Sequence, residues 1–292
     1  MSIVWNVTAT LWYYLIMPTV LAFGYYVIAI NWDRMRIRSN KKRTALTITV
    51  GRTASSVADT VHPQTVENGP STTPMVPYRG FDLSPDESIT RAEQFLEIMK
   101  KRRSLRYFSR KPVPQRVIEC IVETAATAPS GAHTEPWLFV VITNPEVKSK
   151  LRQIIESEEE MNYKQRMGER WVNDLKKFRT NWIKPYLETV SHIIVIFKQT
   201  YGVDKDGNKI QHYYNEISVS IAAGMMLSAI TNAGLVTLTS TPLNAGSQIR
   251  ALLNRPINEK VLLVLPVGYP AEDAVVPDLS RKPLQDVMIN FD

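Results

Sequence analysis

The first 32 residues carry no charged side chain, and this feature constrains the chain more than any other. Within them, the twenty residues 11–30 are apolar or aromatic apart from Thr19, Pro18 and Gly24, all of which membrane helices tolerate. At a rise of about 1.5 Å per residue, a helix of this length matches the hydrocarbon thickness of a bilayer. Tryptophan and tyrosine lie at both ends of the segment, where amphipathic rings prefer the interface. We therefore expect residues 1–33 to form a single-pass membrane anchor.

Basic residues follow this stretch, between Arg34 and Arg43. The positive-inside rule places such residues, and with them the rest of the chain, on the cytoplasmic side of the membrane. A cleaved signal peptide is the competing interpretation, but it would need a basic segment ahead of the apolar one. Residues 34–83 are rich in Thr, Ser, Val and Pro and show no sustained periodicity, which is typical of a flexible linker.

Composition narrows the class of the remaining chain. Hydrophobic residues make up 44% and charged residues 22%, which favours a packed core and excludes a disordered protein. The net charge of +7 suits an anionic partner such as phosphate, or reflects only the basic segment after the anchor. That concentration near the anchor argues against a nucleic-acid-binding role. Cys120 is the single cysteine, so an intrachain disulfide is excluded, and with four histidines the sequence argues against a structural zinc site.

Residues 84–292 alternate between helical and strand patterns. Ser84-Pro85-Asp86-Glu87 is a capping box with proline at the first helical position, and it predicts the start of the first helix. A buried strand is expected at 137–143, and Asn144-Pro145 opens a helix after it. The later predicted elements are strands at 190–197, 235–240 and 261–267 and helices at 215–233 and 247–253. This order predicts an α/β or α+β domain with a central sheet.

Four short motifs have residue types that suit a ligand. The first, Arg102-Arg103-Ser104-Leu105-Arg106, offers guanidinium groups for a phosphate, although a basic cluster at a helix end also complements the helix dipole. The second is the loop of small residues from Ala128 to Trp137, which either lets a flat ligand approach the backbone or is an ordinary connection. The third is the hydroxyl-rich turn at 239–244, at the end of a predicted strand, and the fourth is Arg281.

Together and in this order, the four motifs resemble the flavin-binding set of the nitroreductase superfamily. Longer stretches, among them Ala128 to Trp137, Asn181 to Lys184 and His212 to Ser218, resemble its iodotyrosine deiodinase branch. The resemblance runs from about Glu93 to the C-terminus. It implies an FMN-dependent enzyme with the α+β nitroreductase-like fold, a central mixed sheet flanked by helices. It also implies a homodimer with FMN at the interface.

The resemblance assigns roles to individual residues. The residues implied to bind FMN come from all four motifs and are Arg102, Arg103, Ser104, Leu105, Arg106, Pro129, Ser130, Gly131, Thr239, Ser240, Thr241 and Arg281. Arg281 would close on the phosphate, and Arg106 would lie near the pyrimidine side of the ring system. Thr239 would present its hydroxyl to flavin N5, which makes it the implied catalytic contact and permits one-electron steps.

Residues 155–186 carry many charges and are interpreted as a lid. Glu159 and Tyr163 are four residues apart and would share a helix face, with Lys184 following later in the lid. Taken alone, this acidic run indicates a solvated surface. The resemblance implies instead that Glu159 binds the ammonium and Lys184 the carboxylate of a halogenated tyrosine, with Tyr163 alongside. The backbone N–H of Ala132 would contact the phenolate.

These implications define an expected activity. It is the FMN-dependent reductive dehalogenation of mono- and diiodotyrosine to tyrosine and iodide, with electrons ultimately from NADPH. The sequence contains no Rossmann fingerprint, so NADPH could act directly or through a separate reductase. One alternative is a membrane-tethered FMN nitroreductase or quinone reductase, which would not need Glu159, Tyr163 and Lys184 together. Another is a flavin-free membrane adaptor that uses its cytoplasmic domain for binding.

Overall fold

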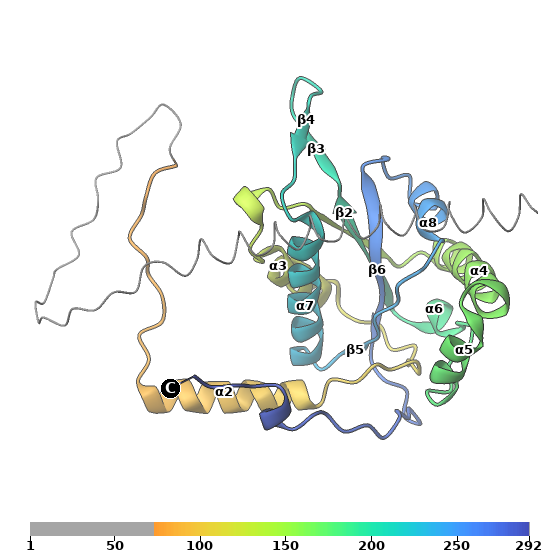
Figure 1. Ribbon diagram of the computed structural model, residues 1–292, viewed down its shortest axis with the longest axis horizontal. Helices are drawn as coiled ribbons and strands as arrows, with labels where there is room; N and C mark the ends of the chain where they lie inside the picture. The colour runs from red at the N-terminus through yellow and green to blue at the C-terminus, as the bar shows by residue number, and fades with distance from the viewer. Residues whose placement is uncertain (1–72, 292) are drawn as a thin grey trace, which may run out of the picture. The chain divides into compact units, whose positions relative to one another are not determined.

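The computed structural model describes residues 73–291, so the predicted anchor and most of the predicted linker lie outside the described residues. The chain divides into two units, and the second, from Arg79 onward, contains every helix and strand named below. In this second unit a sheet separates two layers of helices (Figure 1). Within the described range no helix is both long and apolar enough to cross a bilayer.

The elements follow the predicted order. The helices are α2 (Pro85–Lys100), α3 (Gln115–Ala126), α4 (Pro145–Met161), α5 (Gly168–Lys176), α6 (Tyr186–Thr189), α7 (Asn215–Asn232) and α8 (Gly246–Leu252), with a π-helical turn η2 (Asn162–Arg166) between α4 and α5. The strands are β1 (Trp137–Ile142), β2 (His192–Gln199), β3 (Tyr201–Val203), β4 (Lys209–Gln211), β5 (Val236–Thr237) and β6 (Glu259–Gly268). The capping box is confirmed, because the Ser84 hydroxyl accepts from the Glu87 N–H at 3.2 Å and the Glu87 carboxylate accepts from the Ser84 N–H at 3.0 Å.

The main sheet has the strand order β1-β2-β6-β5. Every neighbouring pair in it is antiparallel, so the expected mixed sheet is wrong for these four strands. The reason is topological: β2 and β5 run in the same direction, joined through α7, but β6 lies between them and opposes both. The one parallel pairing in the described chain is an isolated bridge between Ser104 and Thr237 at the sheet edge.

Strand β2 is buried on both faces, which explains its unbroken apolar sequence. Alternate side chains of a strand point to opposite faces. Ile193, Val195 and Phe197 accordingly pack into one core with α4, α6 and α8, and Ile194 and Ile196 pack into the other with α3 and α7. All five side chains are 0% exposed, so one strand positions both helical layers.

Two predicted strands have other bounds than expected. The strand predicted from Val190 begins at His192, because the carbonyls of Val190 and Ser191 accept hydrogen bonds from the buried Lys148 ammonium instead of a neighbouring strand. The strand predicted at 235–240 keeps only Val236–Thr237, after which the ladder resumes as a single bridge between Ser240 and Val264. The hairpin β3–β4 and the helices α5 and α6 were not predicted.

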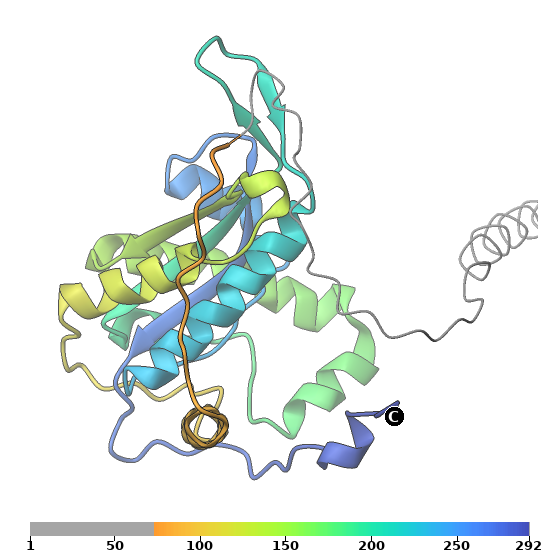
Figure 2. The same ribbon diagram turned by 90° about the vertical axis from the view of Figure 1, so that its left-hand side faces the viewer.

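Helix α2 and the β3–β4 hairpin lie at opposite ends of this unit (Figures 1 and 2). No residue of α2 is buried, and Phe95 and Leu96 are about half exposed. On α7, Ile217 and Ile221 are also exposed, although the helix is apolar on all sides. A helix of this composition is normally covered all round. The described residues therefore leave a substantial apolar surface of this unit uncovered.

Candidate functional site

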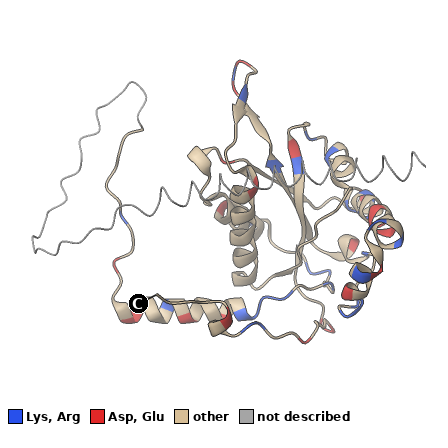
Figure 3. Cartoon of the chain, in the orientation of Figure 1, with Lys and Arg blue, Asp and Glu red and all other residues tan. Residues whose placement is uncertain are grey.

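A basic cleft forms where the chain leaves α2. It has a volume of about 640 Å³ and is lined by Arg102, Arg103, Ser104, Arg106 and Arg281, together with Lys100 and apolar residues. Among the described residues, none of those lining it is acidic. In Figure 3, positions of Lys and Arg colour the ribbon at this end of α2, whereas the ribbon of α7 carries almost no charged positions. Clefts of this size hold small ligands, and convergent guanidinium groups suit a phosphate dianion.

The sheet edge positions the basic segment that lines this cleft. The backbone N–H of Leu105 donates to the Thr237 carbonyl at 3.1 Å, and its side chain is buried. Because side chains alternate along an extended segment, burial of Leu105 turns Ser104 and Arg106 away from the core. Leu105 thus positions the neighbouring residues Ser104 and Arg106 through its backbone hydrogen bond and its buried side chain. Arg103 donates to the Pro277 carbonyl, which ties the cleft to the C-terminal segment that carries Arg281.

The turn that follows β5 lies beside the lid. Ser240 is anchored by its bridge to Val264, whereas Thr239 and Thr241 are exposed. Within the described part of the chain, the hydroxyls of these three residues form no hydrogen bond. A short anchored turn with free hydroxyls can present them to a bound ligand as donors or acceptors.

Two charged groups of the lid have no ion-pair partner among the described residues although neither is exposed. Three of the four glutamates between 156 and 160 pair with cations: Glu156 with Arg152 at 2.7 Å, Glu158 with Arg166 at 2.7 Å, and Glu160 with Lys164 at 2.6 Å. Glu159 has no cation within 4.0 Å among the described residues. Lys184 is buried, and its ammonium donates only to the Asn181 carbonyl within the described range.

These unpaired charges lie close to Arg106. Burial lowers the pKa of the Lys184 ammonium. The negative charge of Glu159 raises this pKa, and the positive charge of Arg106 lowers it. Burial also raises the pKa of the Tyr163 phenol, with Glu159 acting in the same direction and Arg106 against it. Tyr163 is held edge-on against Trp171 and Trp182, with ring centroids 4.9 and 5.8 Å away. The structure therefore brings together Arg106 from the cleft and all three residues predicted to bind the substrate.

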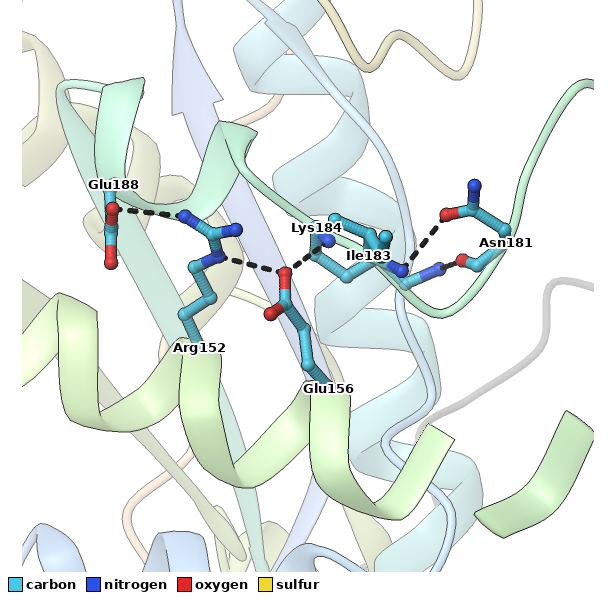
Figure 4. A network of polar contacts seen from close by, with 6 residues as sticks. All are labelled: Arg152, Glu156, Asn181, Ile183, Lys184 and Glu188. Atoms are coloured by element: carbon cyan, nitrogen blue, oxygen red, sulfur yellow. Dashed lines mark hydrogen bonds and ion pairs between the residues drawn. The ribbon is translucent and has the colours of Figure 1, made fainter. Parts of the chain in front are cut away.

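A polar network fixes the segment that carries Lys184 (Figure 4). The Glu156 carboxylate accepts the backbone N–H of Lys184 and the Arg152 guanidinium through the same oxygen, Oε1. Arg152 also donates to Glu188 at 3.0 Å. Asn181 closes the turn by accepting the Ile183 N–H on its side chain at 2.9 Å. The network binds the end of the lid to α4, so that Lys184 is held against a rigid helix.

The loop with Pro129, Ser130, Gly131 and Ala132 lies elsewhere. A Cβ on Gly131 would meet the Tyr213 carbonyl oxygen at 2.8 Å, so the loop packs against the N-terminal end of α7. Strand β1, which follows the loop, begins beside Lys198 at one end of β2. The basic cleft lies at the other end of β2, because Thr237 is paired with Val267 and Val267 with His192. At about 3.3 Å per residue, the six residue steps from His192 to Lys198 separate the two by roughly 20 Å. One chain does not bring this loop to the basic cleft.

Backbone strain marks this loop as more than a connection. Ala132, His133 and Glu135 have φ values of 53°, 53° and 44°, in the left-handed region that non-glycine residues seldom adopt. Such conformations cost about 1–3 kcal/mol each and concentrate at binding sites. The strain includes Ala132, whose N–H is predicted to contact a substrate phenolate.

Sequence reasoning missed the residues that support the lid. Arg152 and Glu156 are four apart on α4, a spacing that predicts an ion pair but not its contact with Lys184. Asn162, which is fully buried, gives no signal in the sequence, because two of its partners, Leu243 and Asn244, lie about eighty residues away.

The residues of the cleft fit FMN as a group. Arg102, Arg103 and Arg281 suit its phosphate, and Ser104 and Arg106 also line a second, neighbouring cavity of about 500 Å³. The free hydroxyls of the turn and the unpaired charges of the lid add contacts for a polar, zwitterionic second ligand.

Comparison with known proteins gives the same assignment. The model of the nitroreductase family matches residues 99–269. The iodotyrosine deiodinase of Danio rerio is 57% identical over 216 residues, covering 74% of this chain and 73% of the relative. Iodotyrosine deiodinase 1 of Homo sapiens is 56% identical over 214 residues, covering 73% and 74%.

Solved structures agree with the sequence comparisons. A crystal structure of oxidized iodotyrosine deiodinase bound to FMN and 3-iodo-L-tyrosine matches with a TM-score of 0.59 at 25% identity, covering 68% of this chain and 98% of that one. A BluB-like flavoprotein from Clostridium difficile 630, at 19% identity and a TM-score of 0.53, shares the fold. This chain therefore belongs to the nitroreductase family and, within it, to the iodotyrosine deiodinases.

Proposed function

We propose that this protein removes iodide reductively from mono- and diiodotyrosine and that it uses FMN to do so. The observation that carries the proposal is the pair of unpaired lid charges, Glu159 and Lys184, close to Arg106 of the basic cleft. A buried ammonium without an anion is unfavourable, so a ligand carboxylate at Lys184 would stabilise the site. A free α-amino acid carries the two opposite charges that this pair requires, whereas an uncharged nitroaromatic or quinone does not.

The chain's own residues bind and orient the substrate in this proposal. Lys184 donates to the carboxylate and Glu159 accepts from the ammonium. The raised pKa of Tyr163 keeps its phenol protonated as a hydrogen-bond donor at neutral pH. The Ala132 N–H of a second copy of the chain offers a neutral donor to the phenolate, because one chain does not bring its own loop to the cleft. Closure of the lid excludes water and fixes the geometry. Arg102, Arg103, Ser104 and Arg281 would hold FMN, which supplies the electrons that reduce the carbon–iodine bond.

We propose a homodimer in which each site combines residues of two chains. The separation of the loop at 129–132 from the basic cleft supports this arrangement, because a second copy could bring its own loop to the cleft. The exposed apolar residues of α2 and α7 support it as well. Between α2, α3 and α7 lies an apolar cavity of about 810 Å³, lined by Phe95, Ile221 and Met225 among others. A second copy of the chain would cover this surface.

Subunit mixing tests the shared site. Arg103→Ala impairs the cleft, and Gly131→Val displaces the loop because even a Cβ there meets the Tyr213 carbonyl. In a shared arrangement, a mixed dimer has one site with both defects and one intact site, so random mixing restores about a quarter of wild-type activity. No recovery on mixing, with mixed dimers demonstrated, would contradict the shared site.

Iodide release tests the activity itself. The FMN-loaded protein is reduced with dithionite and given mono- or diiodotyrosine, and iodide is measured. Glu159→Gln should raise KM for the iodotyrosines by about tenfold or more, because a charged hydrogen bond becomes a neutral one. Glu160→Gln, next to it but paired with the exposed Lys164, is the matched control and should change little. Absence of iodide from the wild-type protein would refute the proposal.

We also propose that residues 1–33 anchor the enzyme as a single-pass membrane protein with a cytoplasmic catalytic domain. The uncharged stretch at 11–30 and the basic residues after it support this. Protease digestion of intact membrane vesicles tests the orientation, since a cytoplasmic domain is cleaved without detergent.

NADPH is the proposed source of electrons, directly or through a reductase, and reduction of the purified protein by NADPH alone distinguishes the two.

A further inference from the structure

Asn162 lies fully buried where the lid leaves α4, and its amide contacts groups on both sides of the site. Its Oδ1 accepts hydrogen bonds from Arg166 Nη1 at 3.2 Å and from Asn244 Nδ2 at 3.1 Å. Its Nδ2 donates to the Leu243 carbonyl at 3.4 Å and to Glu159 Oε1 at 3.5 Å. One side chain thus contacts Glu159 of the lid and the turn that contains Thr239.

The neighbours determine how this amide is oriented. A guanidinium can only donate hydrogen bonds, and a backbone carbonyl or a carboxylate can only accept them. Turning the amide of Asn162 over would set its NH2 against Arg166 and its oxygen against Leu243. The observed orientation is therefore the one that satisfies both sides, and no other side chain of this size offers two donors and two acceptors in the same plane.

The turn that Asn162 contacts is short and braced. Asn244 has a φ of 67°, in the left-handed region that asparagine tolerates better than most residues. Within the turn, the Leu243 N–H donates to the Thr241 carbonyl at 2.8 Å, and Ser240 is held by Val264 on β6. Thr239 and Thr241 flank Ser240, so a displacement of Leu243 or Asn244 is transmitted to their hydroxyls.

We propose that Asn162 is a positioning residue that links occupancy of the amino-acid subsite at Glu159 to the placement of the Thr239 and Thr241 hydroxyls. This inference rests on the proposed function, in which Glu159 binds the ammonium of the substrate. Both donor contacts of Asn162 are near the upper limit for a hydrogen bond, so the amide is shared between Glu159 and Leu243. A bound ammonium donates hydrogen bonds to the Glu159 carboxylate and so weakens the contact of Glu159 with Asn162 Nδ2. Asn162 then donates more strongly to the Leu243 carbonyl and fixes the turn.

Hydrogen exchange provides a test that does not depend on turnover. The full-length FMN-loaded protein, oxidised and without reductant, is compared with and without 3-iodotyrosine. In the wild type, ligand should slow exchange both in the lid and at the Leu243 and Ala245 amides of the turn. In Asn162→Ala the lid should still be protected, and the turn should lose most of its response.

A second variant covers the case in which Asn162→Ala does not fold. Asn244→Gly keeps the left-handed backbone, since glycine adopts it freely, and deletes the amide that donates to Asn162. In both variants kcat for iodide release should fall by about fivefold, the low end of typical couplings between sites, while KM changes by less than about twofold. Glu160→Gln, in the same stretch but facing Lys164, should leave both the turn's exchange and kcat unchanged.

The outcomes separate the two proposals. If 3-iodotyrosine protects neither the lid nor the turn of the wild type, the proposed function fails. If it protects the lid and leaves exchange in the turn unchanged, Asn162 is not a link and the proposed function stands. Wild-type kcat and ligand response in both Asn162→Ala and Asn244→Gly would also overturn the inference.

Discussion

Replacing Glu156 should weaken halotyrosine binding although Glu156 itself does not contact the ligand. Its Oε1 accepts both the Lys184 N–H and the Arg152 guanidinium, the latter at 2.7 Å. The side chains of Arg152 and Glu156 are only 24% and 22% exposed, so water screens this network incompletely. The carboxylate therefore fixes the backbone from which the buried Lys184 side chain extends.

The magnitude follows from the bond to the Lys184 N–H. A hydrogen bond to a charged acceptor contributes about 1.5–3 kcal/mol, against about 0.5–1.5 kcal/mol for a neutral one. Glu156→Gln keeps an oxygen in place and loses about 1 kcal/mol, which is about fivefold in Kd. Glu156→Ala removes the acceptor entirely, and we expect a loss of at least tenfold in affinity.

Equilibrium binding of 3-iodotyrosine to the oxidised FMN-loaded protein, followed by flavin fluorescence, measures the effect without turnover. Glu188→Gln is the matched control, because it removes only the outer, more exposed contact of Arg152 and should change Kd by less than twofold. Thermal unfolding of each variant shows whether the domain remains folded. If Glu156→Ala binds 3-iodotyrosine with the wild-type Kd while Lys184→Ala does not, Glu156 does not position Lys184, and the reasoning is refuted.

Three further predictions concern stability, pH and the cofactor. Gly131→Ala should lower stability by about 1–3 kcal/mol, because the new Cβ would meet the Tyr213 carbonyl oxygen at 2.8 Å; an unchanged Tm would contradict this. Burial, reinforced by Lys148, lowers the pKa of His192 in the folded state, so the unfolded chain binds more protons and stability should fall as pH decreases below 6.5. His192→Gln should remove that step from unfolding curves measured between pH 5 and 7.5. Arg281→Ala should weaken FMN binding but not riboflavin binding, measured by fluorescence titration, because only FMN carries the phosphate.

The elements that the sequence predicted best are those with local signals. The capping box at Ser84, the asparagine cap at Asn144 and the long apolar helix at 215–233 each depend on residues within a few positions of one another. The β3–β4 hairpin also has a local signal, the Asp206-Gly207 pair, and could have been predicted from it. The antiparallel direction of the strands has no such local signal, because it depends on the insertion of β6 between β2 and β5.

The candidate site divides in the same way. Arg102 to Arg106 and the turn at 239–241 are local motifs, and both lie at the site. The separation of the loop at 129–132 from the cleft could not be predicted, because it depends on the pairing of β1 with the far end of β2. The contacts of Asn162 with Leu243 and Asn244 likewise depend on how α4 packs near α8.

The pairing of charges in the lid shows why composition alone suggested a solvated surface. An acidic run normally faces water, and three of its four glutamates have the cation partners expected of such a surface. Two of those partners lie four residues away, the spacing at which side chains on a helix pair, and the third, Arg166, lies eight residues from Glu158 in η2. The exception, Glu159, contacts Asn162 and interacts electrostatically with Lys184. Specificity for an amino acid therefore depends on which glutamate lacks a partner, and a variant that pairs Glu159 internally should lose halotyrosine binding without losing the lid.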